Sequence, residues 1–410
     1  MIYSPGISGL YLSFLCLYGF SALVFSTGSP MNILLAFDSF KDALPASAVC
    51  QSLQRGLTQT FPDATYQSIP LADGGEGTLD VLHAAVPSEW ISCPVSDPLG
   101  RPITARYLWL TGTQTALVEL AQASGLERLT HSERNCLYTS TFGTGQLMAD
   151  ALNRGCTDLI LTVGGSATND AGLGIAAALG YAILDAAGQP MSPTGENLPT
   201  VHTLVPPAWL TENPPVNLRI LTDVTNPFYG PTGAAHVFGE QKGADSATRQ
   251  YLDEGMQHLA AVVEQTLGKN IRQLPGAGAA GGVAGGMAAL FDASIMPATD
   301  YLFAVLNMRA KLRRADLLIT GEGRVDAQSW QGKLVSALLA LAREEHVPAV
   351  LVCGTLQDTR QVLAQPGVLY ATSIIPGPMS LETALTQTPQ LLEEQGLRLG
   401  ALLSGVQLTR

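Results

Sequence analysis

The sequence predicts an α/β protein in which a doubly wound parallel-sheet domain is built from both ends of the chain, with a second domain inserted between them. Strand–loop–helix units occur near the start of the chain and again near its end, and this alternation is typical of a parallel sheet. Between them, from about Ser88, strand-like segments alternate with frequent Pro and Gly. The length of 410 residues also exceeds the ~250–300 residues that one hydrophobic core usually supports.

The first two strand–loop–helix units occupy the start of this domain. A buried strand over Asn32–Phe37 precedes a helix over Ala46–Thr60, in which apolar residues recur at helical spacing. A second strand over Tyr66–Leu71 precedes a short helix over Thr78–Ala85. Two consecutive units of this kind predict neighbouring parallel strands.

The remaining elements follow from the same patterns. In the middle of the chain we expect strands at Ala105–Leu110, Ala116–Leu120, Leu159–Val163, Tyr181–Asp185 and Leu218–Leu221, and helices at Gly145–Asn153 and Ala247–Leu267. Near the end we expect strands at Asp316–Thr320, Ala349–Cys353 and Val368–Ser373, and helices at Val335–Arg343 and Leu381–Leu402. The chain then divides into a discontinuous domain over residues 31–90 and 290–405 and an inserted domain over residues 91–289, with a cleft where the two meet.

Composition excludes several classes of protein. Lys and Arg number 22 against 34 Asp and Glu, and the net charge of −12 has the wrong sign for a protein that binds nucleic acid or an anionic membrane. Only 14% of the residues are charged and 46% are hydrophobic, which excludes a disordered chain and a coiled coil. The six cysteines include no C-x-x-C pair, so a zinc ribbon is excluded and reduced thiols in the cytosol are expected.

Residues 1–30 differ from the rest of the chain because they contain no charged side chain. The run Tyr11–Phe25 is shorter than the ~20 apolar residues of a membrane span, and it lacks the Lys or Arg that opens a secretory signal. We interpret residues 1–30 as an extension outside the working protein, such as an upstream start assigned in error. A weak membrane or export segment is the alternative, and the intact mass of the native protein distinguishes the two.

Four loops carry acidic or hydroxyl residues, and in three of them two or more glycines stand beside these residues. They are Ala72–Thr78, Gly164–Asp170, Thr222–Asn226 and Thr320–Asp326, and each follows a predicted strand. Glycine lets the backbone approach a phosphate closely, and a helix that begins after the loop adds its positive N-terminal end. Carboxylates repel phosphate unless Mg²⁺ lies between them, so these loops indicate a metal–nucleotide site. Any one loop could be an ordinary turn, but all four are predicted at the carboxyl ends of strands, where ligands of such sheets bind.

Other motif matches fail. Gly276–Gly281 fits G-x-G-x-x-G, but a polar segment that ends in Pro precedes it instead of a strand, so close packing or a backbone-lined wall explains these glycines better than NAD binding. Gly332-Lys333 lacks the Ser or Thr of a P-loop. A solvated surface position is the simplest interpretation of Lys41 and Lys242. Arg324 lies inside a glycine-rich acidic loop, where its guanidinium suits a carboxylate or a phosphate.

These loops, in this order, resemble the bacterial type-1 glycerate kinase family from Met31 to about Leu403. The strongest marks are DSFK at 38–41, PLADGGEGT at 70–78, GGSATNDAGLG at 164–174, DVTNPFYGPTGAAHVFGEQKGA at 223–244, PGAGAAGG at 275–282 and GEGRVDAQSWQGK at 321–333. The chain departs from the family pattern at Ala171, where Gly is usual, at Phe228, where Leu is common, and at Glu240, where Pro is frequent. None of these departures removes a polar group, and residues 1–30 have no counterpart in the family.

The resemblance implies ATP-dependent phosphorylation of D-glycerate, with Mg²⁺, in cytoplasmic carbon metabolism, and 2-phosphoglycerate as the product. It also implies a Rossmann- or flavodoxin-like domain that is made from both chain ends around the inserted domain. No nucleic-acid or membrane partner is expected, and the oligomeric state is left open.

As a hypothesis for the mechanism, each polar residue of the loops is given one role. Asp223 accepts the hydroxyl proton, while Lys41 and Lys333 neutralise phosphate oxygens. Arg324 clamps the glycerate carboxylate, and Asp170 and Asp326 ligate Mg²⁺. The further candidates for binding substrate and phosphate are Asp73, Gly74, Gly75, Glu76, Gly164, Gly165, Ser166, Asn169 and Asn226.

Two other classes of function stay open on the sequence alone. The chain could be a nucleotide-binding regulator without catalysis, which a turnover assay with ATP and glycerate decides. It could also be a membrane-tethered sugar-acid binding protein if residues 1–30 insert into a bilayer, which cell fractionation decides.

Overall fold

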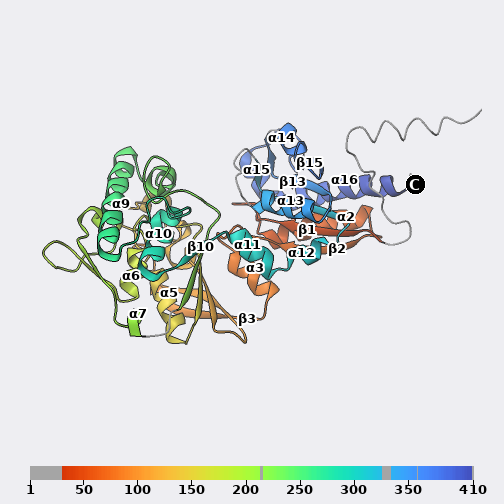
Figure 1. The fold of residues 1–410 in the computed structure, drawn as a ribbon. Coiled ribbons are helices and arrows are strands. Elements are labelled where there is room, and N and C mark those ends of the chain that lie inside the picture. The colour runs from red at the N-terminus through yellow and green to blue at the C-terminus, as the bar shows by residue number, and fades with distance from the viewer. Residues whose placement is uncertain (1–29, 213–215, 326–333, 358, 409–410) are drawn as a thin grey trace, which may run out of the picture.

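The computed structural model describes residues 30–212, 216–325, 334–357 and 359–408, so most of the predicted extension over residues 1–30 lies outside it. Two large sheets lie in the two halves of the molecule in Figure 1. The five-stranded sheet contains β1 (Asn32–Phe37), β2 (Thr65–Pro70), β11 (Leu317–Gly321), β13 (Ala349–Cys353) and β15 (Val368–Ser373). The six-stranded sheet contains β3 (Ser88–Ser96), β4 (Pro102–Leu110), β5 (Thr115–Glu119), β6 (Asp158–Thr162), β9 (Asn217–Leu221) and β10 (Ser294–Met296). The predicted α/β class is confirmed.

The five-stranded sheet is parallel throughout and has the order β15-β13-β11-β1-β2. When its strands are numbered along the chain, this order becomes 2-1-3-4-5, which is the flavodoxin-like arrangement. The order reverses between β1 and β11, so the loops that follow these two strands diverge from the switch point. Ligands of open parallel sheets bind at such a point.

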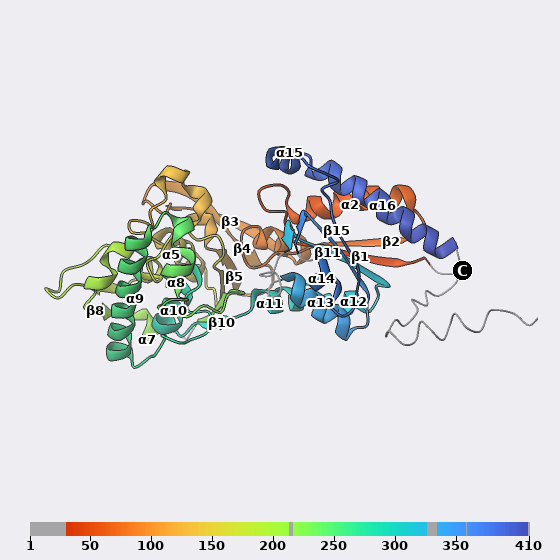
Figure 2. The same cartoon turned by 90° about the horizontal axis from the view of Figure 1, so that it is seen from above.

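Helices cover both faces of this sheet (Figure 2). One face packs against α2 (Ala46–Thr60) and α16 (Thr388–Leu408), and the other against α12 (Met308–Leu312) and α13 (Leu334–Glu344). Successive residues of β1 alternate between the two cores, because side chains along a strand point to opposite faces. Segments from both ends of the chain therefore form one doubly wound domain, a parallel sheet with helices on both faces.

The six-stranded sheet is mixed, with the order β10-β9-β6-β5-β4-β3. Strands β3, β4 and β5 pair antiparallel, and β5, β6, β9 and β10 pair parallel. One face packs against α5 (Phe142–Asn153), α6 (Leu173–Ala178) and α10 (Ala279–Phe291), and the other against α3 (Thr78–Ala85) and α11 (Ala298–Val305). Strand β10, which falls inside the predicted segment 290–405, pairs with β9 of this sheet. The division of the chain into two domains stays a prediction.

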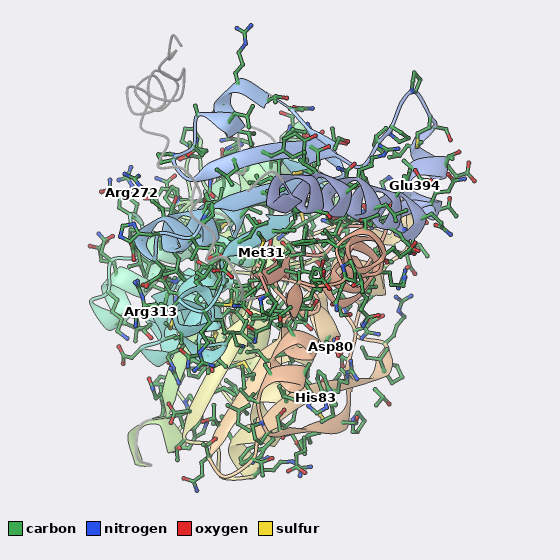
Figure 3. All side chains as sticks on the ribbon, turned by 90° about the vertical axis from the view of Figure 1, so that its right-hand side faces the viewer. Met31, Asp80, His83, Arg272, Arg313 and Glu394 are labelled. Carbon is green, nitrogen blue, oxygen red and sulfur yellow. The ribbon has the colours of Figure 1, made fainter. Side chains whose placement is uncertain are left out.

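Helix α3 contacts the cores of both sheets. Leu79 and Leu82 pack against the six-stranded sheet, whereas Val81 packs into the core beside β2. On its outer side, which Figure 3 shows with Asp80 and His83 labelled, Asp80 forms an ion pair of 3.0 Å with Arg106 of β4. The loop that precedes α3 is therefore held between the two halves.

The remaining elements are short or peripheral. They are helices α4 (Ala121–Ser124), α7 (Trp209–Glu212), α8 (Ala234–Phe238), α9 (Ser246–Leu267), α14 (Thr359–Leu363) and α15 (Leu381–Thr386), the 3-10 helices Leu126–Arg128, His131–Glu133, Gly195–Thr200 and Glu240–Lys242, and the strand pairs β7 (Ala182–Leu184) with β8 (Thr203–Val205) and β12 (Arg324–Val325) with β14 (Thr355–Leu356).

The prediction of one helix over Leu381–Leu402 is wrong, because the structure has α15 and α16 there, with Gln387 between them. Pro389 lacks the backbone N–H that a continuous helix needs at this place. Within the described ranges, no helix combines the length and the apolar character that crossing a bilayer requires.

Candidate active site

The glycine-rich loop after β2 contacts the loop that follows β6 and lies near the end of β9 and the start of α11. The N–H of Gly164 donates to the carbonyl of Gly74 at 3.3 Å, and a Cβ on Gly164 would lie 2.4 Å from the Cα of Gly75. A Cβ on Gly74 would lie 2.6 Å from the Cβ of Ala298 and 3.8 Å from the carbonyl oxygen of Leu221. Glycine at 74 and 164 therefore lets backbone from the two sheets come into direct contact.

The glycine-rich loop that begins at Thr320 lies beside the loop after β1, at the switch point of the five-stranded sheet. The N–H of Asp38 donates to the carbonyl of Gly321 at 3.3 Å. A Cβ on Gly323 would lie 3.4 Å from the backbone nitrogen of Lys41. The predicted residues Lys41 and Arg324 thus come from adjacent loops, and Arg324 is exposed at the start of β12.

Carboxylates gather where these loops meet. Burial and the nearby charges of Asp73 and Glu322 raise the pKa of Asp38 well above its ordinary value, although the N–H of Ser39 donates to Asp38 Oδ1 at 2.6 Å. Asp73 in turn accepts a hydrogen bond of 3.0 Å from the N–H of Gly75. Like charges this close favour a cation between them, because each raises the free energy of ionising the other.

Asp223 follows β9 and joins the same group of acids from the other sheet. Its Oδ1 accepts hydrogen bonds of 3.3 Å from both the N–H and the hydroxyl of Thr299, in the first turn of α11. Its Oδ2 is buried and has no hydrogen-bond partner within the described part of the chain. Burial raises the pKa of Asp223 to about 6; the nearby charge of Asp73 adds to the rise, and the Thr299 hydrogen bonds oppose it.

Asp170 is fully buried and organises the start of α6. Its Oδ2 accepts from the N–H and the hydroxyl of Thr141 at 2.7 and 2.8 Å and from the N–H of Gly174 at 3.1 Å. Its Oδ1 accepts from the N–H of Gly172 at 3.1 Å. Burial raises the pKa of Asp170, and these hydrogen bonds oppose the rise. The carboxylate of Asp170 thus accepts four hydrogen bonds from the chain itself. This geometry favours a structural role over the predicted Mg²⁺ ligation.

The other polar residues of the same loop also face inward. Ser166 Oγ accepts a hydrogen bond of 2.8 Å from Lys242 Nζ, and Asn169 Nδ2 lies 3.3 Å from Met256 Sδ. The carbonyl of Gly165 accepts from the N–H of Leu126 at 2.9 Å. Lys242 is buried, so its interpretation as a solvated surface cation is wrong: the side chain supports this loop from behind.

The remaining predicted residues lie around these loops. A hydrogen bond with Glu127 and partial burial raise the pKa of Glu76 to about 7, and the nearby charge of Lys41 opposes the rise. The Nδ2 of Asn226 donates to the carbonyl of Thr232 at 2.9 Å, so this side chain holds its own loop. Lys333 and Asp326, predicted to bind phosphate and Mg²⁺, lie outside the described residues.

The glycine- and alanine-rich stretch packs against the loop that holds Asp170. A Cβ on Gly281 would lie 2.2 Å from the carbonyl oxygen of Thr168, and the carbonyl of Gly281 accepts from the N–H of Ala171 at 3.0 Å. Gly281 also has a φ of +66°, which few side-chain-bearing residues adopt. The stretch opens α10 without a preceding strand, in line with close packing rather than dinucleotide binding.

Comparison with known proteins finds relatives along almost the whole chain. Residues 33–404 match the model of the glycerate kinase family. The chain belongs to this family. A glycerate kinase of Halalkalibacterium halodurans is 39% identical over 363 residues, which cover 88% of this chain and 96% of the relative. The glycerate 2-kinase of Escherichia coli K12 is 37% identical, covering 86% and 93%. A crystal structure assigned to glycerate kinase 2 of Salmonella typhimurium LT2 superimposes with a TM-score of 0.77 at 33% identity, covering 93% of this chain and all of that one.

Sequence reasoning missed one acidic residue at this edge of the glycerate kinase fold. Glu119 ends β5 and is only 1% exposed. Its Oε2 accepts a hydrogen bond of 3.2 Å from Gln122 Nε2. Its Oε1 has no partner among the described residues, and burial raises the pKa of Glu119 to about 7. The available signal was a lone acid at the end of an otherwise apolar strand.

Replacing this acid by its amide should make the protein more stable at pH 8. The folded-state pKa of about 7 lies above the ordinary value of 4.5, so the native state binds more protons than the unfolded state between these values. The wild type therefore loses stability as the pH rises through this range. Glu119→Gln removes this loss, which is worth up to about 3 kcal/mol. Chemical denaturation of both proteins at pH 5 and pH 8 measures it. The exposed Glu254→Gln is the control, and a pH-independent effect at Glu119 would contradict the assignment.

Proposed function

We propose that this protein is an ATP-dependent glycerate kinase, which transfers the γ-phosphoryl group of ATP to a hydroxyl of D-glycerate. The observation that carries the proposal is the contact of glycine-rich loops from two sheets beside Asp73 and Asp223, in a chain of the glycerate kinase family. The name of the Escherichia coli relative supports the 2-hydroxyl as the acceptor and 2-phosphoglycerate as the product. We place the reaction in the cytoplasm, in line with the buried free cysteines at positions 50, 93, 136, 156 and 353.

Asp223 is the group that we assign to the proton of the acceptor hydroxyl. Thr299 fixes its Oδ1, which leaves the buried Oδ2 free to accept a hydrogen bond. A pKa raised to about 6 suits this task, since the carboxylate is then ionised at neutral pH and is more basic than an ordinary aspartate. The hydroxyl oxygen attacks the γ-phosphorus, the bond to the β–γ bridging oxygen breaks, and the proton passes to Asp223. Placement and electrostatics supply most of the acceleration in such a transfer.

The acids beside Asp73 fit a magnesium ion that arrives with ATP. Mg²⁺ takes oxygen ligands and is usually held by one or two carboxylates together with phosphates and waters. Within the described ranges, no three His, Cys, Asp or Glu side chains form a complete metal site. Asp38 and Asp73 supply oxygens whose crowding a divalent cation would relieve. We therefore move the proposed ligation to Asp38 and Asp73, while the role of Asp326 stays a prediction. When bound, the ion neutralises phosphate charge.

The substrates carry negative charge that the acidic chain must offset locally. We assign Lys41 to phosphate oxygens and Arg324 to the glycerate carboxylate, where a planar guanidinium gives two parallel hydrogen bonds. Lys333 keeps its predicted phosphate role. The backbone N–H groups of Gly74, Gly75, Gly164 and Gly165 are the further candidates for binding anionic oxygens.

A kinase assay with D-glycerate and ATP, followed by phosphorus NMR of the product, tests the proposal. We expect turnover that stops in EDTA and returns when Mg²⁺ is added in excess, because phosphate charge must be neutralised for transfer. The product resonance should couple to the single proton on C2. Absence of turnover in the presence of Mg²⁺ would falsify the kinase assignment and favour a nucleotide-binding regulator.

A further inference from the structure

Lys242 is a buried lysine at the end of the 3-10 helix Glu240–Lys242, with an exposed fraction of 2%. Its main chain is fixed, because its carbonyl accepts a hydrogen bond of 3.1 Å from the N–H of Cys136. Gly243 follows with a φ of +87°, and a Cβ there would lie 1.9 Å from the carbonyl oxygen of Arg134. The chain thus places this side chain in one direction, under the loop that follows β6.

The ammonium group of Lys242 contacts that loop at two points. Nζ donates to Ser166 Oγ and to the carbonyl of Thr168, both at 2.8 Å. Burial lowers the pKa of Lys242 to about 8, and the nearby Cys136 and Asp170 oppose this. The group is therefore mostly charged at neutral pH. Burying a charge is costly unless hydrogen bonds compensate, so these two bonds matter to the fold of the loop.

The direction of the first hydrogen bond determines what Ser166 can do. A lysine ammonium has three donors and no acceptor, so Ser166 Oγ must accept from it. The single hydrogen of the serine hydroxyl is then left for another partner. Within the described residues, the structure gives this hydrogen no acceptor. A hydroxyl that accepts from a cation is also polarised into a stronger donor.

Ser166 stands two residues after Gly164, whose backbone touches Gly75 in the group of converging loops. We propose that Lys242 is a positioning residue, which orients the hydroxyl of Ser166 as a hydrogen-bond donor to an anionic oxygen of a bound substrate. The oxygen belongs to the glycerate carboxylate or to an ATP phosphate. This inference rests on the proposed glycerate kinase reaction. It adds the uncharged hydroxyl of Ser166 to the groups that bind the anionic substrates.

Kinetics of Lys242→Met, Ser166→Ala and the double variant test the proposal. A hydrogen bond to a charged group is worth ~1.5–3 kcal/mol, so each single change should raise the KM of one anionic substrate about 10- to 100-fold. The value of kcat should change much less. The double variant should be no worse than the worse single variant, because both changes remove the same bond. A rise in the KM of glycerate alone identifies the carboxylate, and a rise in the KM of ATP alone identifies a phosphate.

Controls separate this role from a general loss of structure. Lys269→Met removes a lysine that donates to the carbonyl of Ala289 and to Asp292 at 2.8 and 2.6 Å, and it should leave both KM values unchanged. If Lys242→Met does not fold, Ser166→Ala alone decides, and unchanged KM values for both substrates overturn the proposal. Multiplied effects in the double variant, or a lower kcat with unchanged KM values, overturn it as well. Turnover by the wild type tests the kinase function separately.

Discussion

Asp223→Asn is expected to lower kcat by about 10²–10⁴-fold while the KM of ATP changes little. The amide keeps an oxygen that can accept from Thr299, so the first turn of α11 should stay in place. It cannot take up a proton from the acceptor hydroxyl, which is the task we assign to Oδ2. Steady-state kinetics with ATP and D-glycerate measure the effect.

The matched control for this variant is Asp185→Asn. Asp185 also accepts from backbone N–H groups, those of Ala187 and Gln189 at 2.8 Å, but it lies in an exposed turn. The kcat of the Asp185→Asn variant should stay within a factor of two of the wild-type kcat. Turnover of Asp223→Asn near the wild-type value would remove Asp223 from the role of base.

Gly164→Ala is expected to reduce kcat/KM by about 10²-fold or more. The new Cβ would lie 2.4 Å from the Cα of Gly75 and 3.0 Å from its nitrogen, and backbone atoms cannot rotate away as a side chain does. The loops after β2 and β6 must then separate, and a displacement of ~1 Å at a reacting group can cost about 10²-fold in rate. Overpacking of this kind also destabilises a protein by ~1–3 kcal/mol. Kinetics and thermal unfolding together measure both effects.

Gly377→Ala is the control for the added methyl group, because a Cβ at Gly377 meets no atom within 4 Å. It should leave activity and thermal stability unchanged. A Gly164→Ala enzyme with wild-type kcat/KM would show that the contact between the two loops does not position reacting groups.

The sequence predicted the regular elements where local patterns determine them. The apolar run of β1 and the helical spacing in α2 and α3 gave bounds that match the structure residue for residue. The strand β3 was missed, because its sequence is rich in polar residues and contains Pro94, which disfavours a strand. The break at Gln387 was missed because the apolar pattern continues on both sides of it.

The site was predictable where its residue types are unusual for their position. Glycines beside acids identified the loop that bears Asp73, and an acid among hydroxyl and amide residues directly after a predicted strand identified the loop that bears Asp223. Burial in three dimensions was not visible in the same way. Lys242 and Asp170 look like ordinary polar residues in the sequence, and only the structure places the first beneath Ser166 and surrounds the second with four donors.

Residues 71–77 join β2 to α3, and they also carry Asp73 and touch Gly164. One of the two places where the chain crosses between the sheets, and the carboxylate of Asp73, thus belong to one short peptide. A residue added to this peptide changes its reach and displaces a carboxylate at the same time, whereas an addition to the turn at Asp185 alters neither. Among natural variants of this chain, length should therefore be far more constant at 71–77 than at 185–189.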